Sequence, residues 1–274
     1  MSRWLIISSV LSTLVAVSLA TSIFIEPGSI KAAFKDAGKT VGVEVWRIEN
    51  FQPVTVPKPK HGEFYNGDCY VVMNTKEGKN KVKSYDIHFW LGTKTTEDEA
   101  FTAQYFADKL GNMLNGVPVQ HREVEDAESD LFFSYFKGTV RYLEGSVASG
   151  FKHVTTNDPG AKRLFQIKGT KNIRVRQMEL AVSAMNKGDC FILEADREIY
   201  MYVGPTASCV EKLKAIIFAN QVRDQDHTGR SKVHILDEFS TLTDQENFFT
   251  VLGSGSPSLV PDQSTASADA GIHL

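Results

Sequence analysis

Two stretches of the chain, NGDCYVV at residues 66–72 and KGDCFIL at residues 187–193, place Gly-Asp-Cys directly before an apolar run. The β-branched and aromatic residues of both runs are typical of a buried strand. An acidic residue just before such a strand is common in turns. The same combination twice in 274 residues indicates an internal duplication.

The elements around these two stretches recur in the same order. VWRI at residues 45–48 corresponds to LFQI at residues 164–167, and a strand ending at Gly92 corresponds to one ending at Gly204. Apolar residues every three or four positions then predict a long helix in each copy, and another strand and a short amphipathic helix follow. Residues 76–83, rich in Lys, Gly and Asn, predict a hairpin loop in the first copy.

This order predicts an α+β fold of two domains, each a sheet covered by helices. The predicted boundaries are residues 43–144 for repeat 1, 145–162 for a linker, 163–253 for repeat 2 and 254–274 for a disordered tail. Gly, Ser, Thr, Asn and Pro dominate the linker. The tail is poor in charge and in large apolar residues, which is why we expect little order there.

The N-terminus differs in kind from the rest of the chain. Arg3 is followed by seventeen uncharged residues, Trp4 to Ala20, and by small residues ahead of Thr21. This pattern predicts a signal peptide at residues 1–20 and a secreted protein. An uncleaved membrane anchor and a cytoplasmic location are the alternatives.

Composition and motifs exclude several classes of function. The net charge of −3 argues against a nucleic-acid partner. The sequence holds no GxSxG, HExxH, P-loop or dinucleotide fingerprint, so no enzyme is predicted.

A glutamate follows the closing glycine of each copy, and it has two readings. Glu99 lies three residues after Thr96, and Glu211 three residues after Ser208, as in an S/T-x-x-E capping box. Alternatively, each glutamate shares a calcium ion with the aspartate of its Gly-Asp-Cys and with backbone carbonyls, because Ca²⁺ takes oxygen ligands. The recurrence of the pair in both copies favours calcium.

Further motifs resemble those of the gelsolin/villin family: VEVWRIENF, IHFWLG, VQHREV, YFKG and VASGFKHV in repeat 1, and RLFQIKG and RSKVHI in repeat 2. The resemblance is to the first two repeats of a secreted gelsolin. It implies in each repeat a mixed sheet between a long and a short helix. It also implies calcium-regulated binding of actin monomers and filaments, filament severing and barbed-end capping. A secreted module that captures actin monomers without severing is the alternative.

The resemblance also implies site residues. The calcium ligands would be Gly67, Asp68, Glu99 and Val147 in repeat 1, and Gly188, Asp189 and Glu211 in repeat 2, with Asp262 as a candidate acid from the following segment. Contacts with actin would come from Phe51, Tyr105, Phe106 and Phe151, although core packing is an equal reading of Phe106. Binding to the filament side or to phosphoinositide headgroups would involve Lys137, Arg141, Arg163, Lys168, Lys171, Arg174 and Arg176, for which a solvated basic face is the alternative. Any contact with a membrane would be through those headgroups or an uncleaved leader.

Two departures from the family pattern limit these expectations. Gly111 stands where many relatives carry an acid, so a calcium ion shared with actin would lack one charged ligand, and whether that site survives stays open. Val203 stands where secreted relatives carry the partner of Cys190, so no disulfide is predicted there.

Overall fold

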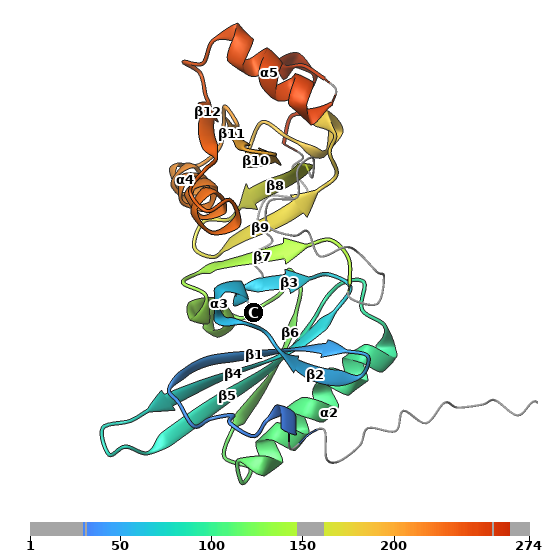
Figure 1. Ribbon diagram of the computed structural model, residues 1–274, viewed down its shortest axis with the longest axis vertical. Coiled ribbons are helices and arrows are strands. Elements are labelled where there is room, and N and C mark those ends of the chain that lie inside the picture. Colours follow the sequence, from blue (N-terminus) through green and yellow to red (C-terminus); the bar gives the residue numbers. More distant parts are fainter. Residues whose placement is uncertain (1–29, 31, 147–161, 254, 264–274) are drawn as a thin grey trace, which may run out of the picture.

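The computed structural model describes residue 30 and residues 32–146, 162–253 and 255–263. Two repeats follow one another along the long axis of the molecule, repeat 1 at the bottom of Figure 1 and repeat 2 at the top. The leader at residues 1–20, Val147 and Phe151 lie outside the described residues. No described helix combines the length and the apolar character needed to cross a membrane.

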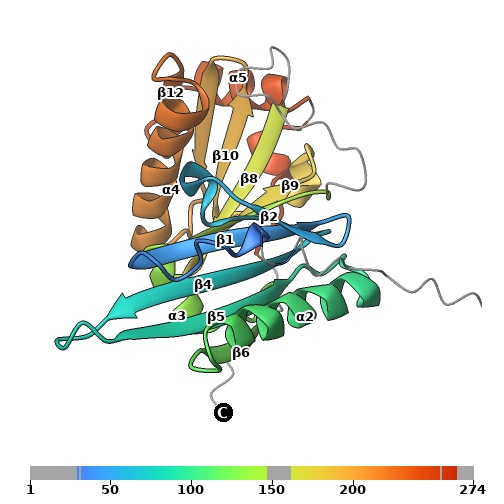
Figure 2. The ribbon, with the colours of Figure 1, turned by 60° about the horizontal axis from the view of Figure 1, so that its bottom comes forward.

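Repeat 1 is built on a five-stranded sheet of order β2-β1-β4-β5-β6. Its strands are β1 (Gly42–Glu49), β2 (Gln52–Thr55), β4 (Cys69–Glu77), β5 (Lys83–Leu91) and β6 (Val119–Val124). The long helix α2 (Glu97–Met113) covers one face of this sheet and the short helix α3 (Asp130–Tyr135) the other (Figure 2).

Alternation along β4 explains this arrangement. Val71 and Met73 pack toward α2, while Tyr70 and Val72 pack toward α3. Successive side chains of a strand point to opposite faces, so a strand that is apolar at every position is buried between two layers. Burying each large apolar side chain contributes about 1.5–3 kcal/mol.

Repeat 2 has the same plan. Its strands are β8 (Lys162–Lys168), β9 (Ile173–Met178), β10 (Cys190–Ala195), β11 (Glu198–Val203) and β12 (Lys232–Leu236). The long helix α4 (Cys209–Gln221) packs on Phe165, Ile167 and Ile192, and the short helix α5 (Leu242–Leu252) packs on the opposite face. Shorter helical segments include η1 (Lys58–Lys60), η2 (Val182–Ala184), the π-helical η3 (Val222–Asp226) and η4 (Pro257–Leu259).

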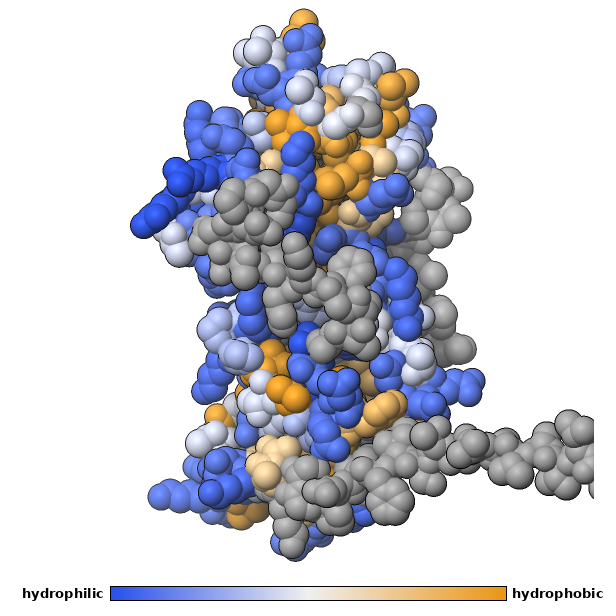
Figure 3. Space-filling view, turned by 45° about the vertical axis from the view of Figure 1, so that its right-hand side comes forward, coloured by the Kyte–Doolittle hydropathy of each residue, from blue (hydrophilic) through white to orange (hydrophobic). Residues whose placement is uncertain are grey.

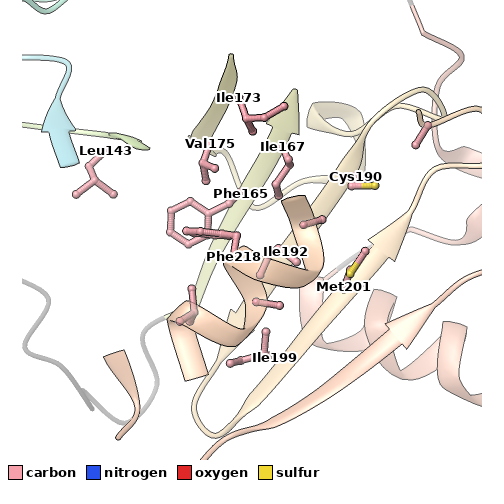
Figure 4. Packing of buried hydrophobic residues seen from close by; sticks show 14 residues of the cluster. Leu143, Phe165, Ile167, Ile173, Val175, Cys190, Ile192, Ile199, Met201 and Phe218 are labelled. Atoms are coloured by element: carbon pink, nitrogen blue, oxygen red, sulfur yellow. The ribbon is translucent and has the colours of Figure 1, made fainter. Parts of the chain in front are cut away.

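Two further strands of repeat 1 join the sheet of repeat 2. β7 (Thr139–Leu143) pairs in parallel with β9, and β3 (Glu63–Tyr65) pairs with β7, giving a seven-stranded sheet of order β12-β11-β10-β8-β9-β7-β3. Val140 and Tyr142 of β7 lie in the core of repeat 1, and Leu143 belongs to the core of repeat 2 (Figure 4). One strand therefore contributes to both cores.

The structure confirms the α+β class and the two-repeat plan, with each mixed sheet between a long and a short helix. The hairpin loop lies between Glu77 and Lys83 as predicted. The expected disordered tail is wrong for residues 255–263, because these form η4 and bury Val260 against α5 and β10. The predicted linker also ends one residue late, since Lys162 is the first residue of β8.

Candidate functional site

The two Gly-Asp-Cys turns have matching backbone geometry. In repeat 1 the N–H of Gly92 donates to the carbonyl of Asp68 at 3.1 Å, and in repeat 2 Gly204 donates to Asp189 at the same distance. A Cβ on Gly92 would lie 2.3 Å from the carbonyl oxygen of Asn66, and one on Gly204 would lie 2.4 Å from that of Asp189. Only glycine fits so close to backbone, so each closing glycine fixes the aspartate turn against the start of the long helix.

Both helices begin with the predicted capping box. The Thr96 N–H donates to Glu99 Oε2 at 3.0 Å, and the Thr96 hydroxyl oxygen accepts from the Glu99 N–H at 3.3 Å. Ser208 and Glu211 make the same exchange at 3.0 and 3.1 Å. Capping is thus confirmed for both glutamates, and it leaves a second role open because carboxylate oxygens have further acceptor capacity.

The aspartate and glutamate of each repeat approach one cysteine. Burial, and after it the charges of Glu99 and Asp68, raise the pKa of the Cys69 thiol well above its ordinary range. Burial, Glu211 and Asp189 raise the pKa of Cys190 to about 12. Both thiols therefore stay protonated at neutral pH.

In repeat 2 the buried Asp189 is surrounded by neutral amides. Its carboxylate accepts hydrogen bonds from Gln166 at 2.5 Å, Asn186 at 2.7 Å and Gln263 at 3.2 Å. The other acid, Glu211, is 7% exposed and also accepts the N–H of Gly169 at 3.1 Å. Within the described parts of the chain, no Lys or Arg forms an ion pair with either acid.

In repeat 1 the aspartate lies near a cation. Asp68 Oδ2 is 3.7 Å from Arg47 Nη1, and Arg47 also binds Glu49 at 2.6 Å. The N–H of Gly67 donates to the carbonyl of Gly145 at 3.0 Å, which brings the end of repeat 1 beside the aspartate turn.

Asp262 is not placed as predicted. Its carboxylate binds Lys187 Nζ at 2.8 Å, and its side chain is 87% exposed. The side chain that reaches Asp189 from the C-terminal segment is Gln263. Asp262 was predicted because an acid was expected as the ligand from this segment, whereas the side chain that contacts Asp189 is an amide.

The donor chemistry fits a hard cation better in repeat 2 than in repeat 1. Carboxylate and carbonyl oxygens are the ligands that calcium prefers, and in repeat 2 the Asp189 carboxylate has no Lys or Arg ion pair among the described residues. Its oxygens accept three amide N–H groups instead, and those amides would have to turn their oxygens inward to join them as ligands. No cluster of three or more His, Cys, Asp or Glu side chains suited to a metal occurs in the described ranges. A calcium site here would therefore depend on backbone and amide oxygens as well as acids.

The predicted aromatic residues are placed differently from one another. Phe106 is fully buried between α2 and the sheet, so the structure assigns it to the core and corrects its prediction as a surface contact. Tyr105 is half-buried on the flank of α2, under Lys109. Phe51 is partly exposed in the β1–β2 turn with φ of 59°, a conformation rare for a bulky residue.

Sequence reasoning missed Phe101. Its side chain is 70% exposed on α2, one helical turn before Tyr105. The apolar stripe that identified the helix does not include it, and a large aromatic residue off the stripe was the signal that was overlooked.

The predicted basic residues form ion pairs inside the chain rather than a free face. Arg141 binds Glu63 and Asp226, and Arg163 binds Glu194. The other pairs are Lys171 with Asp130, Arg174 with Glu128 and Arg176 with Glu125 and Asp126. Lys137 is exposed, and Lys168 is half-buried.

Two hollows flank the junction of the repeats. One of about 330 Å³ is lined by Arg47, Lys60, Tyr70, Arg141 and Arg163 among others. A groove of about 540 Å³ runs between η1, the α3–β7 turn and α4, and its lining includes Lys58, Lys137 and Lys214. In Figure 3 the largest apolar area of the visible face lies over repeat 2.

No disulfide is formed by the described cysteines. Cys69 and Cys190 are buried free thiols, and Cys209 is exposed. Val203 lies directly opposite Cys190 in the β10–β11 ladder, so the residue that faces this cysteine across the ladder is a valine.

Comparison with known proteins gives the family. The model described as the gelsolin repeat matches residues 50–133 and 171–241. Gelsolin of Drosophila melanogaster is 58% identical over 242 residues, which cover 88% of this chain and 30% of the relative. Actin depolymerising venom protein gelsolin 1 of Platymeris rhadamanthus is 50% identical over 230 residues, covering 83% of this chain and 61% of the relative.

A third relative, the cytoplasmic gelsolin of Homarus americanus, is 49% identical over 241 residues, covering 88% of this chain and 32% of the relative. The chain thus spans less than two thirds of the length of each of these relatives. With two matched repeats and the predicted repeat fold, the chain belongs to the gelsolin family, a family of non-enzymatic actin-binding proteins.

Proposed function

We propose that this chain binds actin, severs filaments and caps their barbed ends under the control of calcium. The observation that carries the proposal is the 50% identity, over 83% of this chain, to a relative whose name describes actin depolymerisation. The match covers 61% of that relative.

The outer face of α2 supports a protein contact. Phe101 and Met113 are exposed there by 70% and 42%, and Tyr105 lies between them on the helix. Exposed aromatic side chains with a rigid backbone beneath them are typical anchors of protein interfaces. Phe51, held in a left-handed turn, is a further contact that we propose for repeat 1.

Calcium would be held in repeat 2 by Asp189, Glu211 and the Gly188 carbonyl, and in repeat 1 by Asp68, Glu99 and the Gly67 carbonyl. The bound ion supplies positive charge between the aspartate turn and the start of the long helix. In each repeat the aspartate turn lies against the start of the long helix, α2 or α4, so an ion bound at the turn would act on that helix. In repeat 1, Arg47 competes with the ion for Asp68.

Phosphoinositide headgroups are a second proposed ligand of the same protein. The groove beside the α3–β7 turn presents Lys58, Lys137 and Lys214 on its wall. Clustered lysines attract multiply charged lipid headgroups. Secretion is proposed from the leader sequence, and one relative is named as a venom protein while another is named as cytoplasmic.

Capture of actin monomers without severing is the alternative function. Gly111, where a carboxylate would be needed for a calcium ion shared with actin, is the observation that favours it. Depolymerisation of preformed pyrene-labelled filaments, with calcium and with chelator, separates the two. A severing protein creates new ends and accelerates the loss of signal, whereas a monomer binder does not exceed the rate set by the existing ends. Acceleration in neither condition would contradict severing and favour monomer capture.

A further inference from the structure

A loop of repeat 1 covers the basic edge of repeat 2. Residues 125–130, here called the acidic loop, read EDAESD and carry four carboxylates. Arg176 binds Glu125 and Asp126, each at 2.6 Å, and Arg174 binds Glu128 at 3.3 Å. Beyond them the exposed Lys171 binds the carboxylate of Asp130 at 2.5 Å. In this way the acidic loop meets three consecutive cationic side chains of β9 and the turn before it.

The acidic loop is held rigidly by repeat 1. Glu125 accepts the N–H and hydroxyl of Thr93 on Oε2, at 2.8 and 2.7 Å, and it turns Oε1 toward Arg176. Glu128, the other buried glutamate of the loop, also divides its two oxygens between the two repeats.

Glu128 accepts Trp90 Nε1 at 3.0 Å and the Tyr142 hydroxyl at 2.6 Å on Oε1, and it turns Oε2 toward Arg174. Between the two glutamates, Asp126 has φ of 73°, which sets its carboxylate beside Arg176. One oxygen of each glutamate is thus held by residues of repeat 1, and the other contacts an arginine of repeat 2.

The arginines are shielded on their other side by aromatic rings of repeat 1. Arg174 lies 4.9 Å from the ring centroid of Phe133, and Arg176 lies 4.8 Å from that of Tyr142. Planar guanidinium groups gain from stacking on such rings as well as from paired carboxylates. Both arginine side chains are about three-quarters buried as a result.

We propose that the acidic loop is an intramolecular substitute for an acidic protein surface, and that repeat 2 binds such a surface through Lys171, Arg174 and Arg176 only when the loop is displaced. The loop itself shows the chemistry that these residues recognise, which is a row of peptide carboxylates lying along β9. The inference goes beyond the proposed function, because it holds for any acidic protein partner and does not require actin.

While the acidic loop covers the basic residues (the closed form), the affinity of repeat 2 for an acidic partner is reduced. A ligand that needs the open form has its apparent affinity lowered by the fraction of molecules that are open. Weakening the loop contacts therefore tightens binding without any new contact. Removal of two exposed ion pairs is expected to tighten it roughly threefold to thirtyfold.

The test uses the double variant Asp126→Asn, Asp130→Asn. Both carboxylates are more than half exposed, and asparagine accepts the left-handed backbone of residue 126. The control Glu77→Gln, Glu238→Gln removes the same charge at exposed positions outside the acidic loop. The probe is a fluorescein-labelled poly-L-glutamate peptide, followed by anisotropy at low salt.

The double variant should bind the probe more tightly than the wild-type chain and the control, and Arg174→Gln, Arg176→Gln added to it should abolish the gain. Equal affinity of variant and control would overturn the proposal, as would a gain that survives loss of the two arginines. A gain seen only with vesicles containing phosphatidylinositol bisphosphate would also overturn it, since it would assign the basic strand to a lipid.

Discussion

Arg141 of β7 and Asp226 of η3 form an ion pair across the junction of the two repeats, with 3.3 Å between Nη1 and Oδ2. The guanidinium lies over the rings of Phe165 and Phe218, with 4.6 and 5.0 Å to their centroids. Burial would lower the pKa of Arg141, but the charges of Glu63 and Asp226 outweigh burial and raise it, so the group stays charged. The two repeats are therefore joined by a buried charge pair as well as by β7.

Arg141 and Asp226 should be energetically coupled. Asp226→Asn leaves the buried guanidinium with less compensation, and we expect the free energy of unfolding to fall by about 2–3 kcal/mol. The double variant Arg141→Met, Asp226→Asn should lose less than the sum of the single variants. Urea unfolding of the three variants checks this, and strict additivity would mean that the two residues are not coupled.

The closing glycines should be intolerant of any side chain. A Cβ at Gly204 would lie 2.4 Å from the Asp189 carbonyl, so Gly204→Ala should destabilise the chain by about 3 kcal/mol. The matched control is Gly229→Ala, whose Cβ meets nothing within 4 Å and whose cost, about 1 kcal/mol, comes from its positive φ. Chemical denaturation compares the two, and equal losses would show that the close approach at Gly204 is not real.

Glu211 should act both as a cap and as a calcium ligand. In Glu211→Gln only one side-chain oxygen remains for the N–H groups of Gly169 and Ser208, so stability in chelator should fall by about 1–2 kcal/mol. Calcium affinity, measured by calorimetry, should fall at least about tenfold because a charged ligand is lost.

The control for Glu211 is Asp244→Asn, which weakens the capping box of α5 far from either Gly-Asp-Cys turn. It should lower stability slightly and leave calcium affinity unchanged. If Glu211→Gln lowered stability while calcium affinity stayed at the wild-type value, the glutamate would be a cap alone.

Glu123 predicts a pH dependence of stability. Burial would raise the pKa of this carboxyl, but hydrogen bonds from His88 and Ser129 outweigh it and hold the pKa below its ordinary value of 4.5. A lowered folded-state pKa adds stability above pH 4.5, and this is lost as the pH falls through the folded-state value. The stability gap between wild type and Glu123→Gln should be constant from about pH 7 to pH 6 and should narrow below about pH 4.5. Urea titrations across that range measure it, and a gap that widens at low pH would contradict the assignment.

Much of the fold was predictable because it repeats. The continuous apolar runs of β4 and β10 and the spacing of Ala103, Phe106 and Leu110 are local signals. β7 could not be found in this way, since its pairing with β9 joins residues far apart in sequence. The order of residues 255–263 was also hidden, because it depends on Val260 entering a core built by α5 and β10.

The site was predictable where backbone geometry decides it and not where long-range charge does. In each repeat the capping glutamate follows the closing glycine by seven residues. The closing glycine is hydrogen-bonded to the aspartate turn, and the glutamate to the N-cap of the long helix. The basic residues of β9 looked free in the sequence, because the acidic loop that binds Arg174 and Arg176 lies some 50 residues earlier. Gln263 was missed because an amide carries no charge to attract attention.

The most direct test of the proposed function is microscopy of single, surface-attached actin filaments exposed to this chain. We predict that filaments break along their length in calcium, that breaks become rare in chelator, and that new barbed ends stay capped. Filaments that remain unbroken in calcium, at concentrations where the chain binds actin monomers, would contradict severing and assign the protein to monomer capture.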